Sequence, residues 1–322
     1  MNRVDSFERP FDLVALGEPM IEFNQRHGAS TAYVQGFGGD TSNCVVAAAR
    51  MGARTAYVSR VGDDRFGNMF LELWQREGVD TNSVAVDPAA HTAVYFVSHT
   101  AAGHAFSYLR SGSAASRLCA AELPAALLAR TRVLHVSGIS QAISASACDA
   151  VFAAIELARA AGARIAYDPN LRLSLWPLPR ARAIIKATVP LCDWFLPSLE
   201  EVGQLFDVRE PQSALDACHD LGAPLVALKC GAAGAWISTN GSRERVAGHR
   251  VDSVDATGAG DCFDGVLMAR MLAGDAPRDA ARFANAAAAL KTLGYGAVAP
   301  LPRHDAVAAF LARPAAETAG AH

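Results

Sequence analysis

The sequence predicts an α/β protein with a doubly wound, mostly parallel β-sheet. Short runs of apolar and β-branched residues alternate with segments of helical length and composition, and this alternation is typical of βαβ units. All but one of the apolar runs are followed directly by Gly, Pro, Asp or Ser, which commonly end strands. The chain has 322 residues, of which 51% are hydrophobic, and this is enough to bury a large core.

Six of these runs form the predicted sheet, and the helices between them cover its two faces. The strands are expected at residues 13–16, 55–58, 133–136, 164–167, 194–196 and 225–228. The helices are expected at residues 44–51, 68–77, 145–161, 213–221, 266–272 and 279–293. We expect one domain over residues 1–322.

Two stretches break this alternation, because each holds a pair of strands with no helix between them. The strands are expected at residues 20–23, 32–34, 93–98 and 105–108. They predict a small antiparallel sheet, inserted from about 18–38 and 90–112, that stands off the core as a lid. A fixed extension of the sheet edge is the alternative. Open edge strands would pair with a second copy, so a dimer through the lid is expected.

Composition excludes several classes of protein. A net charge of -3 offers no basic field for nucleic acid and no polybasic patch for an anionic membrane. The 7 cysteines never occur as Cys-x-x-Cys, which argues against a thiolate zinc site and a disulfide framework. No uncharged apolar stretch is long enough to span a bilayer, and no signal peptide is evident. We therefore expect a soluble, cytoplasmic protein.

The strongest local pattern is the segment 255–261, Asp-Ala-Thr-Gly-Ala-Gly-Asp, directly before an apolar helix. Small residues at a helix start leave backbone N–H groups free for an anion, so those of Gly258, Ala259 and Gly260 are expected to bind a phosphate oxygen. Asp261 is expected to keep a low pKa beside the helix dipole and to accept the proton of an attacking hydroxyl. The alternative is a helix cap after a glycine-rich turn.

Two other phosphate-binding patterns are excluded. The segment 258–263 lacks the third Gly of the dinucleotide fingerprint and lies in the last third of the chain. A Walker A loop requires a Lys directly after a Gly, and none of the three lysines follows a Gly. A dinucleotide fold and P-loop chemistry are therefore not expected.

The segment 255–261 resembles the C-terminal signature of the ribokinase-like (PfkB) carbohydrate kinases, with Ala256 where the family usually has Thr. A second family mark stands at 38–43, Gly-Gly-Asp-Thr-Ser-Asn, followed by Val-Gly-Asp-Asp at 61–64. The likeness runs from about residue 11 to about residue 311. It implies a ribokinase-like fold and ATP-dependent phosphorylation of a sugar with Mg²⁺. It also implies, for many members, a monovalent cation such as K⁺ beside the anion site, held by backbone ligands.

Within that family the chain is most similar to 2-keto-3-deoxygluconate kinases, through residues 108–110, 113–116, 168–172 and 175–176. The resemblance implies a sugar acid, whose carboxylate would be bound by the planar fork of an arginine. It places seven residues at the sugar, with the two glycines as lid hinge: Gly38, Gly39, Asn43, Tyr95, Tyr108, Arg110 and Arg172. Alternatives are a helix-cap role for Asn43, packing inside the lid for Tyr95 and a salt bridge for Arg172.

The resemblance also places residues at the nucleotide. Lys229, Gly231 and Gly234 match a family turn over the ATP phosphates, with a glycine-rich hairpin as the alternative. The remaining assignments are Asn170 near the transferring phosphoryl group, Ser198 where the family has Asn, Glu201 for Mg²⁺ and Asn285 near the adenine.

These residues predict ATP-dependent phosphorylation of the primary hydroxyl of a sugar acid, 2-keto-3-deoxygluconate, to its 6-phosphate. The expected partners are therefore a small sugar acid and ATP. One alternative is another PfkB sugar kinase that acts on fructose, ribose or a nucleoside. The other is a non-catalytic sugar-sensing protein of the same fold.

Overall fold

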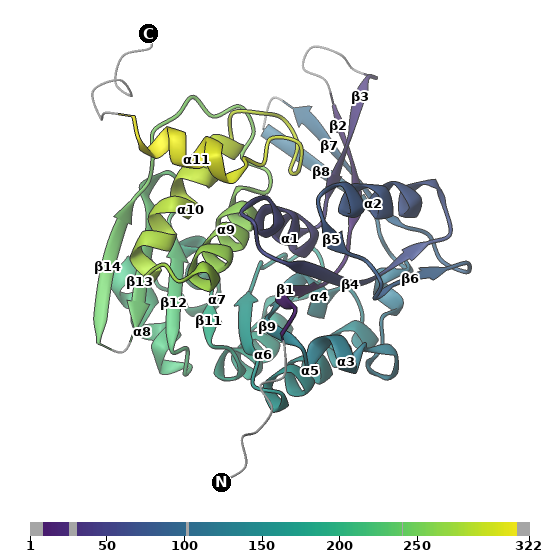
Figure 1. Ribbon diagram of the computed structural model, residues 1–322, viewed down its shortest axis with the longest axis horizontal. Coiled ribbons are helices and arrows are strands. Elements are labelled where there is room, and N and C mark those ends of the chain that lie inside the picture. Colours follow the sequence, from purple (N-terminus) through teal and green to yellow (C-terminus); the bar gives the residue numbers. More distant parts are fainter. Residues whose placement is uncertain (1–8, 26–30, 101–102, 240, 314–322) are drawn as a thin grey trace.

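A large sheet with helices on both faces forms the body of the protein (Figure 1). The computed structural model describes residues 9–25, 31–100, 103–239 and 241–313. The strand order is β14-β13-β12-β11-β10-β9-β1-β4-β5, with β6 paired to β4. The pairs from β12 to β5 are parallel, and β13 and β14 continue the sheet antiparallel. The strands are β1 (Phe11–Leu16), β4 (Thr55–Gly62), β5 (Val79–Asp80), β6 (Val84–Asp87), β9 (Thr131–Ser137), β10 (Arg164–Asp168), β11 (Trp194–Phe195), β12 (Leu225–Lys229), β13 (Gly234–Thr239) and β14 (Ser242–Ala247).

Two apolar cores lie on opposite faces of this sheet. One is built with helices α1 (Asp40–Arg50), α2 (Arg65–Arg76), α9 (Ala259–Ala273), α10 (Pro277–Lys291) and α11 (His304–Leu311). The other is built with α3 (Ala125–Leu128), α5 (Ala145–Ala160), α6 (Leu178–Thr188), α7 (Leu199–Phe206) and α8 (Pro211–Asp220). The short helix α4 (Gly138–Ala142) follows β9. This two-faced arrangement confirms the predicted fold class, and all six predicted core strands are present.

The predicted lid is a second sheet that stands out from the body (Figure 1). Its order is β3-β2-β7-β8, from β2 (Met20–Gln25), β3 (Tyr33–Gly38), β7 (Ala93–Thr100) and β8 (Gly103–Leu109). The two hairpins are antiparallel, as predicted, but β2 and β7 pair in parallel. Both hairpins leave the body after a parallel strand, β1 or β6, so their first strands run in the same direction.

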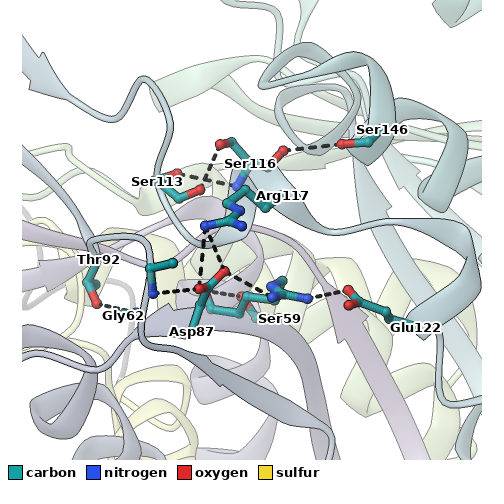
Figure 2. A network of polar contacts seen from close by, with 11 residues as sticks. Ser59, Gly62, Asp87, Thr92, Ser113, Ser116, Arg117, Glu122 and Ser146 are labelled. Atoms are coloured by element: carbon teal, nitrogen blue, oxygen red, sulfur yellow. Dashed lines mark hydrogen bonds and ion pairs between the residues drawn. The ribbon is translucent and has the colours of Figure 1, made fainter.

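A polar network fastens the segment that follows the lid to the body (Figure 2). Asp87, at the end of β6, accepts hydrogen bonds from Arg60 at 2.9 Å and from Arg117, which lies beyond the lid. Arg60 also pairs with Glu122. On the entry side, the backbone N–H of Gly62 donates to the Thr92 hydroxyl at 2.9 Å. The hairpin of β7 and β8 is therefore attached to the body through the segment before β7 and through the segment after β8.

Helices α1 and α9 pack against each other at unusually short range. A Cβ atom at Gly265 of α9 would overlap the backbone oxygen of Cys44 in α1 and would lie 2.9 Å from the Cβ of Ala47. Only glycine permits this approach. The contact brings the first turns of the two helices together at one edge of the large sheet.

All seven cysteines are free. Within the described ranges, no helix combines the length and the apolar composition that a bilayer span requires.

Candidate active site

Polar residues from four parts of the chain converge at the carboxyl edge of the large sheet. Asn43, in the first turn of α1, donates to the Asp261 carboxylate in the first turn of α9, at 2.7 Å. Asp168 ends β10 and Lys229 ends β12, and their side chains meet at 3.0 Å. Asn170 lies two residues beyond β10. In an open α/β sheet, ligands bind at this edge.

Asp261 has a strongly raised pKa. Burial, and after it the negative charge of Asp40, raise the pKa to about 7, although the hydrogen bond from the Asn43 amide acts in the opposite direction. The expectation of a low pKa was therefore wrong, because loss of solvent outweighs the helix dipole and the hydrogen bond. The side chain still keeps part of its surface accessible. A carboxylate with a pKa near the working pH is well suited to accept a proton.

The turn before α9 presents backbone donors, but not the set that was expected. The N–H of Ala259 is engaged, because it donates to the Ala256 oxygen at 3.1 Å. Within the described ranges, the N–H groups of Gly258, Gly260 and Asp261 have no protein acceptor. Gly258 has φ +75° and its Cβ would lie 3.0 Å from that of Ala297, so the turn requires glycine there. Of the three N–H groups expected to bind an anion, that of Ala259 is therefore engaged, and the N–H of Asp261 is available in addition to those of Gly258 and Gly260.

Three buried oxygens around Asp261 lack a hydrogen-bond partner among the described residues: Oδ1 of Asp40, Oδ1 of Asn43 and Oδ1 of Asp264. Burying a polar atom without a partner is costly, and such atoms often mark a ligand site. Asp40 and Asp264 were not among the predicted site residues. Asp40 is the third residue of the family mark 38–43, and Asp264 lies three residues after the mark 255–261, so a signal for them was present.

Lys229 lies in a buried charge cluster. Its ammonium group donates to Asp168 at 3.0 Å and to Asp264 at 2.8 Å. These two carboxylates raise the pKa of Lys229, and the lysine charge holds the pKa of Asp168 below its usual range, whereas burial raises the pKa of Asp264. A Cβ at Gly260 would lie 3.8 Å from the lysine nitrogen. The lysine is thus next to the turn 255–261 while paired with two carboxylates.

Ser198 and Glu201 form the capping box of α7. The Ser198 hydroxyl accepts from the Glu201 N–H at 3.2 Å, and Glu201 accepts from the Ser198 N–H at 2.7 Å. The other Glu201 oxygen accepts from the Leu171 N–H at 2.8 Å. Burial raises the pKa of Glu201. In the described part of the chain no cluster of three or more His, Cys, Asp or Glu is arranged for a metal ion. The metal role of Glu201 stays a prediction.

The other predicted nucleotide residues have local structural partners. Asn170 has φ +32° and donates to Asp40 at 3.2 Å. Asn285 donates to the backbone oxygens of Val246 and Ala247, which attaches the end of β14 to α10. Gly231 and Gly234 both have positive φ values in the turn between β12 and β13, where a Cβ at Gly234 would overlap the Val246 oxygen. Their roles at a nucleotide remain predictions.

On the lid side, Tyr95 and Arg110 are both held by buried glutamates. The Tyr95 hydroxyl donates to Glu22, and a Cβ at Gly38 would lie 2.5 Å from that hydroxyl. Arg110 forms an ion pair with Glu18, which also accepts from the Ser113 hydroxyl at 2.5 Å. Glu18 was not predicted, although it lies only two residues after the end of the first strand. The positive charge of Arg110 is therefore already balanced.

Three further residues complete the sugar side. Tyr108 is partly exposed, stacks on Tyr95 with ring centroids 6.1 Å apart and lies under the Arg110 guanidinium. Gly39 joins β3 to α1 with φ +99°, and a Cβ there would overlap the backbone of Glu18. Arg172 is exposed and donates only to the neighbouring Leu171 oxygen, so the alternative of a salt bridge is not found among the described residues.

Comparison with known proteins gives a consistent result. Residues 6–304 match the pfkB family carbohydrate kinase domain. The 2-dehydro-3-deoxygluconokinases of Thermoproteus tenax and Bacillus subtilis are 36% and 35% identical, over 88% and 93% of this chain and 89% and 95% of theirs. Fructokinase-2 of Zea mays is 35% identical over 90% of this chain and 91% of its own.

Solved structures agree in fold. A putative ribokinase II from E. coli, in complex with ATP and Mg²⁺, superposes with a TM-score of 0.86 at 27% identity over 94% of this chain and 99% of that one. A double mutant of fructokinase from Vibrio cholerae, in a fructose, ADP and potassium ion bound form, superposes with a TM-score of 0.85 at 30% identity, with the same coverage.

Proposed function

Because the chain belongs to the pfkB family of carbohydrate kinases, we propose that it transfers the terminal phosphoryl group of ATP to the primary hydroxyl of a sugar acid. The proposed substrate is 2-keto-3-deoxygluconate, which would be phosphorylated at O6. One observation supports phosphoryl transfer most directly: Asp261, with its pKa of about 7, lies beside the N–H groups of Gly258 and Gly260, which have no described acceptor. The similarity to two 2-dehydro-3-deoxygluconokinases supports the substrate.

In this mechanism Asp261 accepts the proton of the attacking hydroxyl. The hydrogen bond from Asn43 holds the Asp261 carboxylate in place. The N–H groups of Gly258, Gly260 and Asp261 donate to the oxygens of the phosphoryl group in transit, where the positive end of α9 adds to the attraction. Lys229 contributes positive charge beside the turn. Phosphoryl transfer needs mainly such positioning and charge stabilisation.

The donor set fits a nucleotide with its metal ion. Unpartnered N–H groups suit phosphate oxygens, and the lack of an acidic metal cluster in the described ranges suits an ion held mainly by phosphates and water. Mg²⁺ bound with ATP would offset phosphate charge, and Glu201 is the carboxylate that we propose beside it. We propose that Lys229, Gly231 and Gly234 pass over the phosphates. For the remaining two nucleotide residues, we propose Asn170 near the phosphoryl group and Asn285 near the adenine.

At the sugar, we propose that Asn43 binds a hydroxyl through its unpartnered Oδ1 and that Arg172 binds the carboxylate. The lid carries Tyr95, Tyr108 and Arg110, and it would cover the sugar and exclude water as it turns at Gly38 and Gly39. The reaction would take place in the cytoplasm, where ATP is supplied.

A neutral sugar such as fructose is the second candidate. It is favoured by one observation: Glu18 already neutralises Arg110, one of the two cations expected for a sugar acid. The nearly equal identity to the maize fructokinase is consistent with this reading. A coupled assay of ATP consumption against 2-keto-3-deoxygluconate, gluconate, fructose and ribose separates the two candidates.

We expect Arg172→Ala to raise KM for 2-keto-3-deoxygluconate by about 10- to 100-fold, because a hydrogen bond to a charged group is worth about 1.5–3 kcal/mol. The KM for fructose should change little, because fructose has no carboxylate. Initial rates measured for both sugars with the wild-type protein and the variant give the ratio of the KM values of the variant and the wild-type protein for each sugar.

The neutral double variant Glu18→Gln with Arg110→Met tests the second arginine without leaving a buried charge unpaired. Equal changes in KM for the acid and for fructose in both variants would contradict the sugar-acid assignment. A higher kcat/KM for fructose than for 2-keto-3-deoxygluconate in the wild-type protein would favour the second candidate function, phosphorylation of a neutral sugar.

We also propose a dimer through the lid. Exposed apolar side chains gather on the lid strands at its two edges: Tyr33, Val34, Phe106, Tyr108 and Leu109. We expect Val34→Asp to shift the protein from dimer to monomer in sedimentation velocity. Val86→Asp, at a similarly exposed position on β6, should leave the dimer intact. A wild-type protein that sediments as a monomer at high micromolar concentration would contradict the proposal.

A further inference from the structure

Lys291 is a fully buried lysine that the proposed mechanism does not use. It is the last residue of α10 and has no exposed surface. Its ammonium group donates to the backbone oxygen of Asp255 at 2.8 Å. Lysine is almost never buried to this extent without a direct carboxylate partner, and among the described residues Lys291 forms no such ion pair.

The position of this ammonium group is next to the anion-binding turn. Asp255 opens the turn 255–261, and its carboxylate accepts from the N–H groups of Thr257 at 2.9 Å and Gly296 at 2.8 Å. The segment after α10 also contacts the start of this turn, because the Thr292 oxygen accepts from the Asp255 N–H at 3.1 Å. Lys291 therefore contacts the turn at its first residue, Asp255, and the N–H groups without a described acceptor belong to its later residues, Gly258 and Gly260.

Negative groups surround the lysine at longer range. Burial lowers the pKa of Lys291, and the charges of Asp255, Glu22 and Asp261 act to raise it. A buried charge interacts strongly over several ångströms, because little water screens it. Lys291 thus adds positive potential to the region in which a phosphate would lie.

The surroundings do not fit a free monovalent cation at this position. Such an ion takes backbone carbonyl and carboxylate oxygens. The Asp255 carbonyl is already bound to the ammonium group, and both carboxylate oxygens of Asp255 accept backbone N–H groups. An ammonium group has the charge of K⁺ and is close to it in size, so it can serve as a tethered substitute.

Building on the proposed function, we propose that Lys291 is a positioning residue that supplies the built-in cation of the phosphate-binding turn. The protein therefore binds ATP without a free monovalent cation. A purely structural role, in which the lysine only complements the C-terminal end of the α10 dipole, predicts a different outcome in the test below.

The test measures ATP affinity by calorimetry and Tm by scanning fluorimetry, in KCl, NH₄Cl and choline chloride at equal ionic strength. For the wild-type protein, we expect the same affinity and the same Tm in all three salts. For Lys291→Ala, we expect affinity in choline chloride to fall by about tenfold or more, because the variant removes a weakly screened positive charge close to the phosphates. KCl or NH₄Cl should restore it, because the shortened side chain leaves room beside the Asp255 carbonyl.

Two controls separate charge from folding. Lys291→Met removes the charge but fills the space, so its affinity should fall and no salt should restore it. Lys186→Ala removes an exposed lysine on α6 and should behave like the wild-type protein.

Two results would overturn the inference. One is a wild-type affinity that rises several-fold in KCl over choline chloride. The other is a Lys291→Ala variant with a lowered Tm but the wild-type affinity in choline chloride. If the wild-type protein bound no ATP in any salt, the proposed function would fail. The Tm values measured without ATP would still decide whether Lys291 occupies the position of a monovalent cation. A rise in Tm specific to K⁺ and NH₄⁺ in Lys291→Ala alone supports a cation position there, and equal Tm values in all salts contradict it.

Discussion

Asp261→Asn is expected to lower kcat by about 10²–10⁴-fold, the usual contribution of general acid–base catalysis. Asparagine keeps the shape of the side chain and can still contact Asn43, but it cannot accept the proton of the attacking hydroxyl. The KM values for sugar and ATP should therefore change little. Steady-state kinetics with saturating ATP give both constants.

The pH dependence adds a signature that follows from the pKa of about 7. The base must be deprotonated, so the kcat of the wild-type protein should rise with pH and level off above about pH 7. Folded Asp261 also binds its proton more tightly than the unfolded chain does. This group therefore makes the folded state less stable as pH rises between the unfolded pKa of about 4 and the folded pKa of about 7. The Asn variant should lack that decline.

Asp279→Asn is the matched control, because Asp279 is an exposed aspartate in the first turn of the neighbouring helix α10. It should keep the wild-type kcat and pH profile. An Asp261→Asn variant with unchanged turnover would remove Asp261 from the role of base. Equal losses in the two variants would point to a general effect of charge instead.

Lys229→Met should produce the largest loss of stability. It leaves Asp168 and Asp264 buried beside each other without their shared cation. Removing one partner of a buried ion pair costs about 3–5 kcal/mol in the free energy of unfolding. The loss should shrink as pH falls, because both carboxylates then become protonated. Urea unfolding at several pH values measures the effect.

Arg243→Met gives the comparison at the surface. It breaks the ion pair with Asp216 at 2.5 Å, whose side chains are 33% and 60% exposed, and such pairs contribute about 0–1 kcal/mol. The double variant Lys229→Met with Asp264→Asn should recover part of the stability. If Lys229→Met cost no more than Arg243→Met, the cluster would not be the buried charge centre described above.

Much of the fold could be predicted because its signals are local. Six apolar runs, five of them followed directly by Gly, Pro, Asp or Ser, identify β1, β4, β9, β10, β11 and β12, whereas the short strands β5 and β6 were not predicted. The parallel pairing of β2 with β7 could not be predicted in the same way. It depends on the edge from which each hairpin leaves the body, and that is a property of the assembled sheet.

The site shows the same division. The motifs identified Asp261, Asn43 and Lys229, and the structure brings all three to one edge. The pKa of Asp261 depends on how deeply it is buried and on Asp40, 221 positions earlier, so the sequence alone misjudged it. The pairing of Arg110 with Glu18 joins residues 92 positions apart. The capping box of Ser198 and Glu201, in contrast, has the Ser-x-x-Glu spacing, which is a local pattern that can be recognised in the sequence alone.

The absence of a side chain at Gly265 has a consequence for how this enzyme can diversify. The length of the bond between Asn43 and Asp261 depends on how closely two helices approach, and a single missing methyl group sets that approach. In the proposed mechanism, the basicity of Asp261 thus depends on an interior position that contacts neither sugar nor nucleotide. A substitution at such a position would change the pH range of the proposed reaction while every residue proposed to contact a reactant stays the same.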